Sequence, residues 1–156
     1  MKLSARALRF ILNCYPPFWG AGIKVETLSN DFSFAKVSMA FRWYNKNYMR
    51  TQFGGSLYSM TDPFFALMLI HRLGPEFIVW DKQGEIDYIQ PGKSRVYADF
   101  VLTDEQVAII KDTASENGKH LPVFHTEIYD QDKQTIATVK KTLYVKRVGK
   151  SHKSAK

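Results

Sequence analysis

The sequence has 156 residues but only one cysteine, Cys14, and four histidines that are scattered along the chain. A lone cysteine excludes an internal disulfide, and with these dispersed histidines it gives no ligand combination typical of a zinc site. We therefore expect neither a metal nor another cofactor. Paired cysteines are common in proteins of oxidising compartments, so their absence favours a cytoplasmic protein.

Long apolar runs are also lacking, and none reaches the roughly 20 residues that a membrane-spanning helix needs. The N-terminal stretch is a poor signal peptide, because Arg6 and Arg9 interrupt its apolar part and no small-residue cleavage site follows. Residues 3–14 instead predict an amphipathic helix docked on the domain. Its apolar face is expected to comprise Leu3, Ala7, Phe10, Ile11 and Cys14.

Acidic residues are absent from the last seventeen residues, which hold seven lysines and arginines. The rest of the chain is close to neutral, so the net charge of +7 comes from this end. Aromatic and basic residues do not alternate there as they do on nucleic-acid-binding surfaces. We predict a flexible basic tail over residues 149–156 and no nucleic-acid partner.

The remaining length fits a single domain over residues 1–148, with the helix in residues 1–15 packed on it. Alternation of apolar and polar residues predicts strands, most clearly where Val37 and Met39 alternate with Lys36 and Ser38. The predicted strands are 23–28, 33–41, 77–88, 95–102, 121–130 and 135–146. Residues 16–22 are expected to form a rigid turn, and residues 104–111 a short helix capped by Asp104.

The most apolar segment begins at Gly54-Gly55 and is predicted to be one long helix that runs to Arg72. A helix that is apolar nearly all round must be covered on most sides. The order of elements therefore predicts an α+β domain in which a mostly antiparallel sheet wraps this central helix.

Asp62 is the one carboxylate within this apolar segment. A buried carboxylate without partners costs several kcal/mol or gives up its charge, so Asp62 must have a partner or a function. Two interpretations stay open from the residues alone. Asp62 is either a catalytic group or, because Pro63 follows it, a cap for a helix that restarts there.

These segments resemble the hotdog-fold acyl-CoA thioesterases, in the branch of the phenylacetate-pathway enzymes and a related branch with Phe-Gly-Gly at the helix start. The likeness lies in "FGGSLYSMTDP" (53–63), "IVWDK" (78–82) and "IDYIQPG" (86–92). It implies a hotdog fold, an acyl-CoA substrate, and assembly into dimers or tetramers. A hotdog dehydratase is a poorer match, because the His-plus-acid signature of those enzymes is missing.

The resemblance also implies roles for single residues. Gly54 would donate its backbone N–H to the thioester oxygen, Asp62 would be the base or nucleophile, and Asn47 would supply a nearby amide. The substrate-binding residues are expected to be Phe53, Gly55, Tyr58, Lys82 and Arg50, while Lys93 and Arg95 are further candidates for coenzyme A phosphates. Phe53 stands where phenylacetate-type enzymes have His, which keeps open a non-catalytic protein that binds an acyl or lipid-like ligand.

Helix geometry adds one expectation. Eight residues of helix rise about 12 Å, so Gly54 and Asp62 of one chain cannot reach the same carbonyl. Two antiparallel helices of a two-fold dimer would bring Gly54 of one subunit opposite Asp62 of the other. The candidate site is therefore predicted to require a homodimer.

Overall fold

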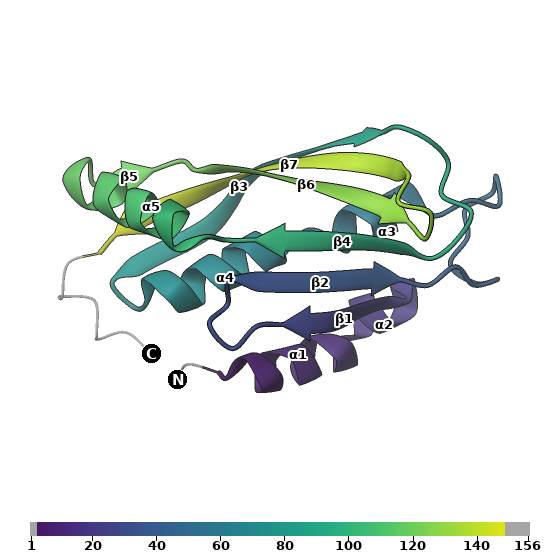
Figure 1. Ribbon diagram of the computed structural model, residues 1–156, viewed down its shortest axis with the longest axis horizontal. Coiled ribbons are helices and arrows are strands. Elements are labelled where there is room, and N and C mark those ends of the chain that lie inside the picture. The colour runs from purple at the N-terminus through teal and green to yellow at the C-terminus, as the bar shows by residue number, and fades with distance from the viewer. Residues whose placement is uncertain (1–2, 149–156) are drawn as a thin grey trace.

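The computed structural model describes residues 3–148, which form one antiparallel sheet wrapped around a central helical segment (Figure 1). The sheet order is β1-β2-β4-β6-β7-β3, and a short β5 pairs with β7. The strands are β1 (Ile23–Leu28), β2 (Phe34–Met39), β3 (Phe77–Tyr88), β4 (Val96–Val101), β5 (Lys119–His120), β6 (Val123–Asp130) and β7 (Thr135–Arg147). The six longer strands confirm the predicted ones to within two residues at either end, and β5 is an addition.

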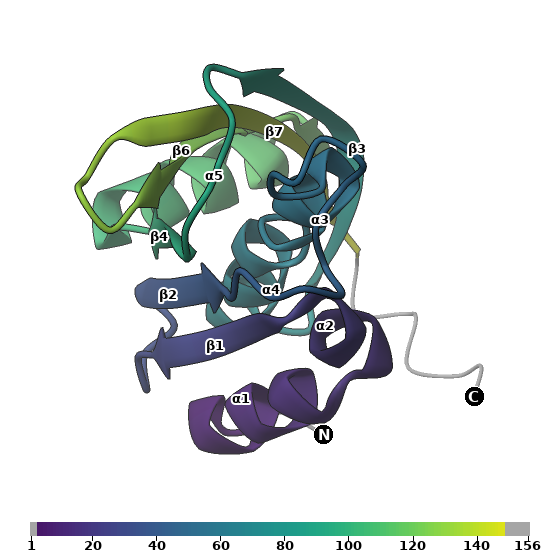
Figure 2. The same cartoon turned by 90° about the vertical axis from the view of Figure 1, so that its right-hand side faces the viewer.

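The helices are α1 (Ala5–Cys14), α2 (Pro16–Ala21), α3 (Gly54–Ser59), α4 (Phe64–Leu73) and α5 (Asp104–Glu116). Figure 2 shows the sheet curving around α3 and α4, with α1 outside it along β1. The core lies between α4 and the sheet, where Phe65 contacts Phe100 and Phe124 with ring centroids 5.2 and 4.6 Å apart. The predicted helix wrapped by an antiparallel sheet is therefore confirmed.

The central helix is broken, which corrects the prediction of one continuous helix. α3 ends at Ser59, and α4 begins only at Phe64 after a tight turn. Pro63 has no N–H to donate into a preceding helical turn, and this explains why the helix stops and restarts there. The break places Asp62 on the turn between α3 and α4.

The N-terminal helix docks through a different face from the expected one. Ala5 and Leu8 are buried, whereas Phe10 is 70% and Ile11 48% exposed. The cause is a polar contact, because the side-chain amide of Asn13 accepts from the backbone N–H of β1 and donates to a carbonyl there. These bonds fix the rotation of α1 about its own axis. The apolar residues of α1 cover so wide an arc of its surface that they alone do not determine which side packs on the sheet.

Two further local predictions were wrong. Residues 16–21 form helix α2 rather than a turn, since Pro16 and Pro17 occupy the first helical positions, where no N–H is needed. Thr103 rather than Asp104 caps α5, through reciprocal hydrogen bonds with Gln106, and the helix extends to Glu116.

The two edges of the sheet differ. The outer edge of β1 is occupied, because Asn13 bonds both backbone groups of Val25 and Arg9 donates to the carbonyl of Glu26. β3 forms the other edge and, within residues 3–148, pairs only with β7. A long unpaired edge strand is a ready template for pairing with another chain.

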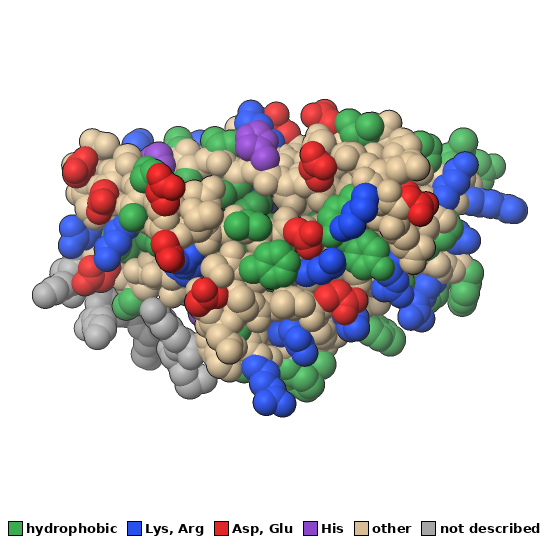
Figure 3. Space-filling model, viewed as in Figure 1, with side chains coloured by type: hydrophobic (Ala, Val, Ile, Leu, Met, Phe, Trp, Pro, Cys, Tyr) green, Lys and Arg blue, Asp and Glu red, His purple; other side chains and the backbone are tan. Residues whose placement is uncertain are grey.

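The outer face of the sheet carries side chains of both charges over β4 and β6, with hydrophobic side chains between them (Figure 3). None of the helices in the described part of the chain is long and apolar enough to cross a membrane. Residues 3–148 also contain no cluster of three or more His, Cys, Asp or Glu side chains suited to a metal ion. The predicted tail at 149–156 lies outside the described residues.

Candidate functional site

The start of α3 opens into a cavity of about 410 Å³. Gly54 and Gly55 line it, and neither backbone N–H donates a hydrogen bond within the described residues. Phe53 is the N-cap, and it offers no side-chain acceptor for these groups. Two free donors therefore face a cavity that a small ligand could enter.

The position of this helix start is fixed from both sides. Tyr88, at the end of β3, donates its hydroxyl hydrogen to the carbonyl of Gly54 at 3.0 Å. A Cβ added to Gly54 would lie 3.0 Å from the hydroxyl oxygen of Tyr88, so only glycine fits without a shift. The buried amide of Gln52 donates to the carbonyls of Ala40 and Ser94 and so ties the preceding loop to β2 and β4.

Asn47 lines the same cavity, but its side chain is engaged within its own loop. Its Oδ1 accepts from the N–H of Thr51 at 3.0 Å, and its Nδ2 donates to Thr51 Oγ1 and the Gln52 carbonyl. In this conformation the amide supports the loop that leads into α3. Its predicted contact with a substrate stays a prediction.

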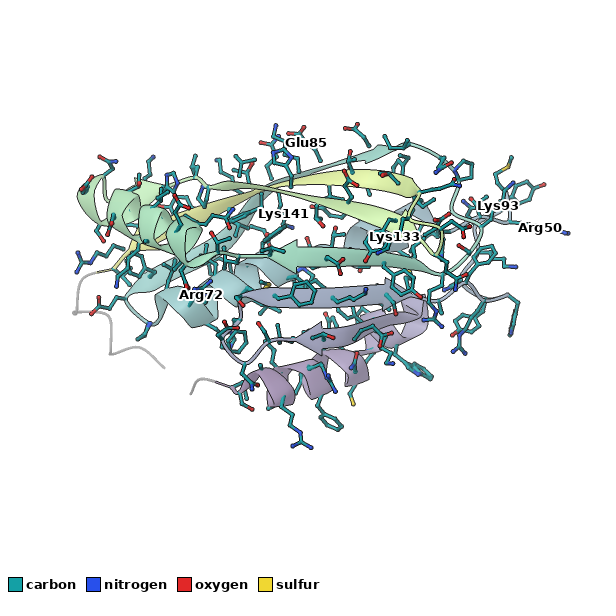
Figure 4. All side chains as sticks on the ribbon, in the orientation of Figure 1. Arg50, Arg72, Glu85, Lys93, Lys133 and Lys141 are labelled. Carbon is teal, nitrogen blue, oxygen red and sulfur yellow. The ribbon has the colours of Figure 1, made fainter. Side chains whose placement is uncertain are left out.

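Asp62 is not buried in the single chain, which corrects the reasoning that singled it out. Its side chain is 48% exposed, and its Oδ1 lies 2.5 Å from Nζ of Lys141 on β7 (Figure 4). Asp62 also makes no capping hydrogen bond to α4, so the capping interpretation is excluded. Its partner is a lysine whose side chain is only 3% exposed.

Lys141 is the centre of a small polar cluster. Its ammonium contacts Asp81 Oδ1 on β3 at 3.0 Å as well as Asp62, and it lies 3.5 Å from the Tyr58 hydroxyl. Gly84 makes room for that hydroxyl, since an added Cβ would collide with it. The cluster thus draws its members from α3, the α3–α4 turn, β3 and β7.

The charge of Lys141 is retained although the side chain is buried. Burial alone would lower its pKa, but hydrogen bonds and the charges of Asp62 and Asp81 outweigh this and raise the pKa above its ordinary value of 10.5. Two carboxylates against one ammonium leave one negative charge in excess. The second oxygen of Asp62, Oδ2, has no hydrogen-bond partner within residues 3–148.

The structure separates the two central candidates, Gly54 and Asp62, within one chain. Asp62 does not line the Gly54 cavity, and the length of α3 lies between them. Of the substrate-binding candidates, Phe53 and Gly55 line that cavity, whereas Tyr58 lies against Lys141.

Two substrate-binding candidates lie outside both groups. Lys82 is exposed at a bulge of β3, where the register with β7 shifts between Asp81 and Gln83. Arg50 lies at an exposed loop tip, near the end of the molecule that also carries Lys93 (Figure 4).

Sequence reasoning missed Lys141, although a signal for it was present. Lys141 falls on the same alternate positions of β7 as Val139, Leu143 and Val145, which are all buried. A cation on the core side of a strand requires an anionic partner. Tyr88 and Gln52 were also missed, and they carry no comparable signal because their contacts are long-range.

The sequence profile of the family "Domain of unknown function (DUF4442)" matches residues 4–145. The chain belongs to this family. The comparison with curated proteins gave no significant match.

Solved structures share the architecture over nearly the whole chain. PA5026 of Pseudomonas aeruginosa, described as a probable thioesterase, has a TM-score of 0.85 at 15% identity, covering 95% of this chain and 99% of its own. The thioesterase HI1161 of Haemophilus influenzae has a TM-score of 0.68 at 13% identity, with coverages of 97% and 96%. The PaaI protein of the E. coli phenylacetic acid degradation operon has a TM-score of 0.60 at 19% identity, with coverages of 94% and 91%. The hotdog fold predicted from the resemblance is confirmed, and at these identities the likeness concerns the fold.

Proposed function

We propose that the protein hydrolyses acyl-CoA thioesters at a site shared between two subunits. One observation carries the proposal. The buried ammonium of Lys141 holds one oxygen of Asp62 and leaves the other free, while the unpaired N–H groups at Gly54 and Gly55 open into a cavity. A free carboxylate oxygen and a pair of free backbone donors are the two groups that acyl transfer requires.

The backbone donors would act on the thioester oxygen. Attack on the carbonyl carbon moves negative charge onto this oxygen, and the N–H of Gly54 would stabilise it there. Removing one donor of this kind typically costs on the order of 100-fold in rate. The fit between Gly54 and Tyr88 keeps the donor in place.

Asp62 would act through Oδ2 in one of two ways. As a base it would take a proton from a water that attacks the carbonyl, after which the C–S bond breaks and the thiolate leaves and is protonated. As a nucleophile it would attack the carbonyl itself and form a mixed anhydride that water then hydrolyses. Lys141 would fix the orientation of the carboxylate in both cases.

A second subunit would complete the site. The unpaired edge of β3 supports pairing with the same strand of a second copy, because an isologous two-fold contact matches each edge with itself. Such a pair would place the two central helices antiparallel and bring Gly54 of one subunit toward Asp62 of the other. The pairing of dimers into tetramers is a further expectation from the resemblance.

The first experiment is a hydrolysis panel of acyl-CoA substrates, from acetyl to long-chain and aryl groups, followed by thiol release. Asp62→Asn is compared with Asp112→Asn, which removes an exposed carboxylate of α5 that belongs neither to the Lys141 cluster nor to the Gly54 cavity. We expect one acyl class to be cleaved by the wild-type protein and by Asp112→Asn, and not by Asp62→Asn. Equal activity of the two variants would overturn the role of Asp62.

The shared site is tested by mixing two inactive variants. In a heterodimer of Gly54→Ala with Asp62→Asn, one site carries both changes and the other carries neither. Random mixing should therefore restore about one quarter of the wild-type activity. No recovery, with heterodimers present, would show that each site lies within one chain.

A second candidate is binding of an acyl ligand without turnover. It is favoured by the commitment of the Asn47 amide to its own loop, which leaves that group unavailable to a substrate. A non-hydrolysable thioether analogue of acyl-CoA distinguishes the two functions in calorimetry. Tight binding of the analogue with no hydrolysis of any thioester in the panel would favour this candidate.

A further inference from the structure

A second cavity, of about 470 Å³, lies beside the candidate site and has a different chemical character. It is formed where α2 ends, β1 and β4 begin, and the chain leaves β2. Three cationic side chains line it, together with two aromatic ones: Lys24, Arg42, Arg95, Trp19 and Tyr44. The cavity therefore suits an anion that also carries a flat apolar group.

The positive charge of this cavity is only partly balanced. Glu26 accepts from Lys24 at 2.9 Å and from the hydroxyl of Ser38, to which Arg95 also donates. Glu26 is the one carboxylate engaged here, and the guanidinium of Arg42 forms no ion pair or hydrogen bond within residues 3–148. Two positive charges are thus left for a ligand.

The surrounding chain is also rich in positive charge. No Asp or Glu occurs between Asp31 and Asp62, whereas Arg42, Lys46 and Arg50 fall in the loop before α3. Figure 3 shows lysines and arginines at this end of the molecule, where Figure 4 marks Arg50 and Lys93. An anionic ligand would be attracted to this end before it is bound.

The wall that carries Arg42 is rigidly built. The buried amide of Asn45 donates to the carbonyls of Ala21 and Ala40, and its oxygen accepts from the N–H of Arg42. Gly22 has a φ of +75°, and an added Cβ would lie 2.8 Å from Asn45 Nδ2. The backbone that presents Arg42 is therefore held in place without a ligand.

The aromatic side chains provide surfaces for stacking. Trp19 is 76% and Tyr44 46% exposed, although large aromatic side chains are usually covered. Stacking of a nucleic-acid base on an exposed aromatic ring is worth about 1–3 kcal/mol. Two such rings beside unbalanced cations match a purine nucleotide better than a simple phosphate.

This cavity is linked to the candidate site by shared lining residues. Tyr44 also lines a smaller hollow of about 290 Å³, together with Lys46, Phe53 and Ser56. Phe53 in turn lines the cavity at Gly54. Tyr44 and Phe53 thus form common walls in a row of three hollows between the cationic cavity and the start of α3.

We propose that the cavity at Arg42 and Trp19 binds the 3′-phosphoadenosine diphosphate end of coenzyme A. The phosphates lie against Arg42, Lys24 and Arg95, the adenine lies on Trp19 or Tyr44, and the pantetheine arm follows the hollows toward Gly54. The assignment rests on the proposed function, and it selects coenzyme A over a carrier protein. A phosphopantetheinyl carrier has one phosphodiester and no base, so it would leave both the aromatic rings and one cation unused.

The direct test is calorimetric binding of adenosine 3′,5′-bisphosphate, which contains no thioester. We expect binding by the wild-type protein, a loss of about tenfold or more in affinity for Arg42→Ala, and a smaller loss for Trp19→Ala. Lys111→Ala, which removes an exposed cation of α5 at the opposite end of the molecule, is the matched control and should bind normally (Figure 1). Circular dichroism verifies that each variant is folded.

Three results would overturn the assignment. The first is no binding by the wild-type protein, and the second is equal binding by Arg42→Ala and Lys111→Ala. The third is equal affinity for ribose 5-phosphate, which would mean that no base is recognised.

A second comparison separates this inference from the proposed function. The KM for acyl-CoA should rise in Arg42→Ala while kcat and the hydrolysis of acyl-pantetheine stay unchanged. If the wild-type protein has equal kcat/KM for both substrates and does not bind the bisphosphate, the proposed nucleotide site is wrong and the proposed thioesterase activity stands. If the protein binds the bisphosphate but hydrolyses no thioester, the nucleotide site stands and the proposed thioesterase activity is wrong.

Discussion

Lys141 Nζ lies 2.5 Å from Asp62 Oδ1 and joins the turn between α3 and α4 to strand β7. The ammonium is buried and the carboxylate is half exposed. Loss of the ion pair therefore costs the lysine more than it costs the aspartate. Asp62 retains water when the lysine is removed, whereas Lys141 has no access to water when its carboxylates are removed. Asp81, at 3.0 Å, shares the task of balancing its charge.

This asymmetry predicts opposite outcomes for changes on the two sides of the cluster. The double variant Asp62→Asn/Asp81→Asn leaves a buried, unpaired ammonium and should lose about 3 kcal/mol of stability. Lys141→Met keeps the aliphatic stem packed and leaves two partly hydrated carboxylates, so it should change stability by less than about 1 kcal/mol. Urea unfolding of both variants measures the difference. A greater loss for Lys141→Met would contradict the asymmetry.

The pH dependence of stability follows from the raised pKa of Lys141. A group whose pKa is higher in the folded state stabilises the fold fully below its unfolded pKa, here 10.5, and this contribution is lost as the pH rises through the folded value. Wild-type stability should therefore fall relative to Lys141→Met above about pH 10.5. Thermal unfolding from pH 7 to 11.5 compares the two proteins. Parallel curves over this range would mean that Lys141 does not titrate differently on folding.

Tyr129 contributes in the same direction, and this contribution is common to both proteins in that comparison. Burial and the hydrogen bond that its hydroxyl donates to Asp99 raise its pKa above the ordinary value of 10. Because the unfolded chain loses this proton first, stability again falls as the pH rises. Only the difference between wild type and Lys141→Met reports on Lys141.

The fold could be predicted from the sequence because its signals are local. Period-two patterns gave the strands, and a helix apolar on all sides required a sheet around it. The exact packing of α1 could not be predicted in this way. Its apolar residues cover more than half of the helix surface. The hydrogen bonds of Asn13 to the edge of β1 determine which side of the helix packs on the sheet.

The candidate site could be predicted only in part, for a related reason. Gly54 and Asp62 stand out because each is unusual in its own segment. Lys141 lies 79 residues from Asp62, and its neighbour Lys140 made it resemble the start of a basic tail. A pair of this kind depends on which segments are adjacent in the fold, and a single sequence gives the positions of helices and strands more readily than their arrangement in space.

Two glycine-to-alanine changes separate close packing from helix propensity. A methyl group at Gly54 would meet the ring of Tyr88, so Gly54→Ala should lose about 1 kcal/mol of stability and most of the hydrolytic activity. Gly20→Ala in α2 meets nothing within 4 Å and should gain about 0.5 kcal/mol, because alanine favours the helix. Unfolding and hydrolysis assays compare them. Full activity of a folded Gly54→Ala variant would contradict the expectation that the added methyl group displaces the backbone N–H at this position.

The side chain of Asn47 supports the loop before α3, and we also expect it to take part in catalysis. A comparison of variants at Asn47 and Thr51 distinguishes these two roles. Asn47→Ala removes three hydrogen bonds that hold the loop before α3 and should cost about 2 kcal/mol. Thr51→Val removes only the hydroxyl that accepts from Asn47 Nδ2, and should cost about 1 kcal/mol.

Activity decides between the two roles of Asn47. If its amide also orients a substrate carbonyl or a water, Asn47→Ala lowers kcat by tenfold or more, whereas Thr51→Val leaves kcat near the wild-type value because the amide is still present. Losses of kcat that simply follow the losses of stability in both variants would assign Asn47 to loop support. The loop would then act on catalysis only by fixing where the N–H of Gly54 points.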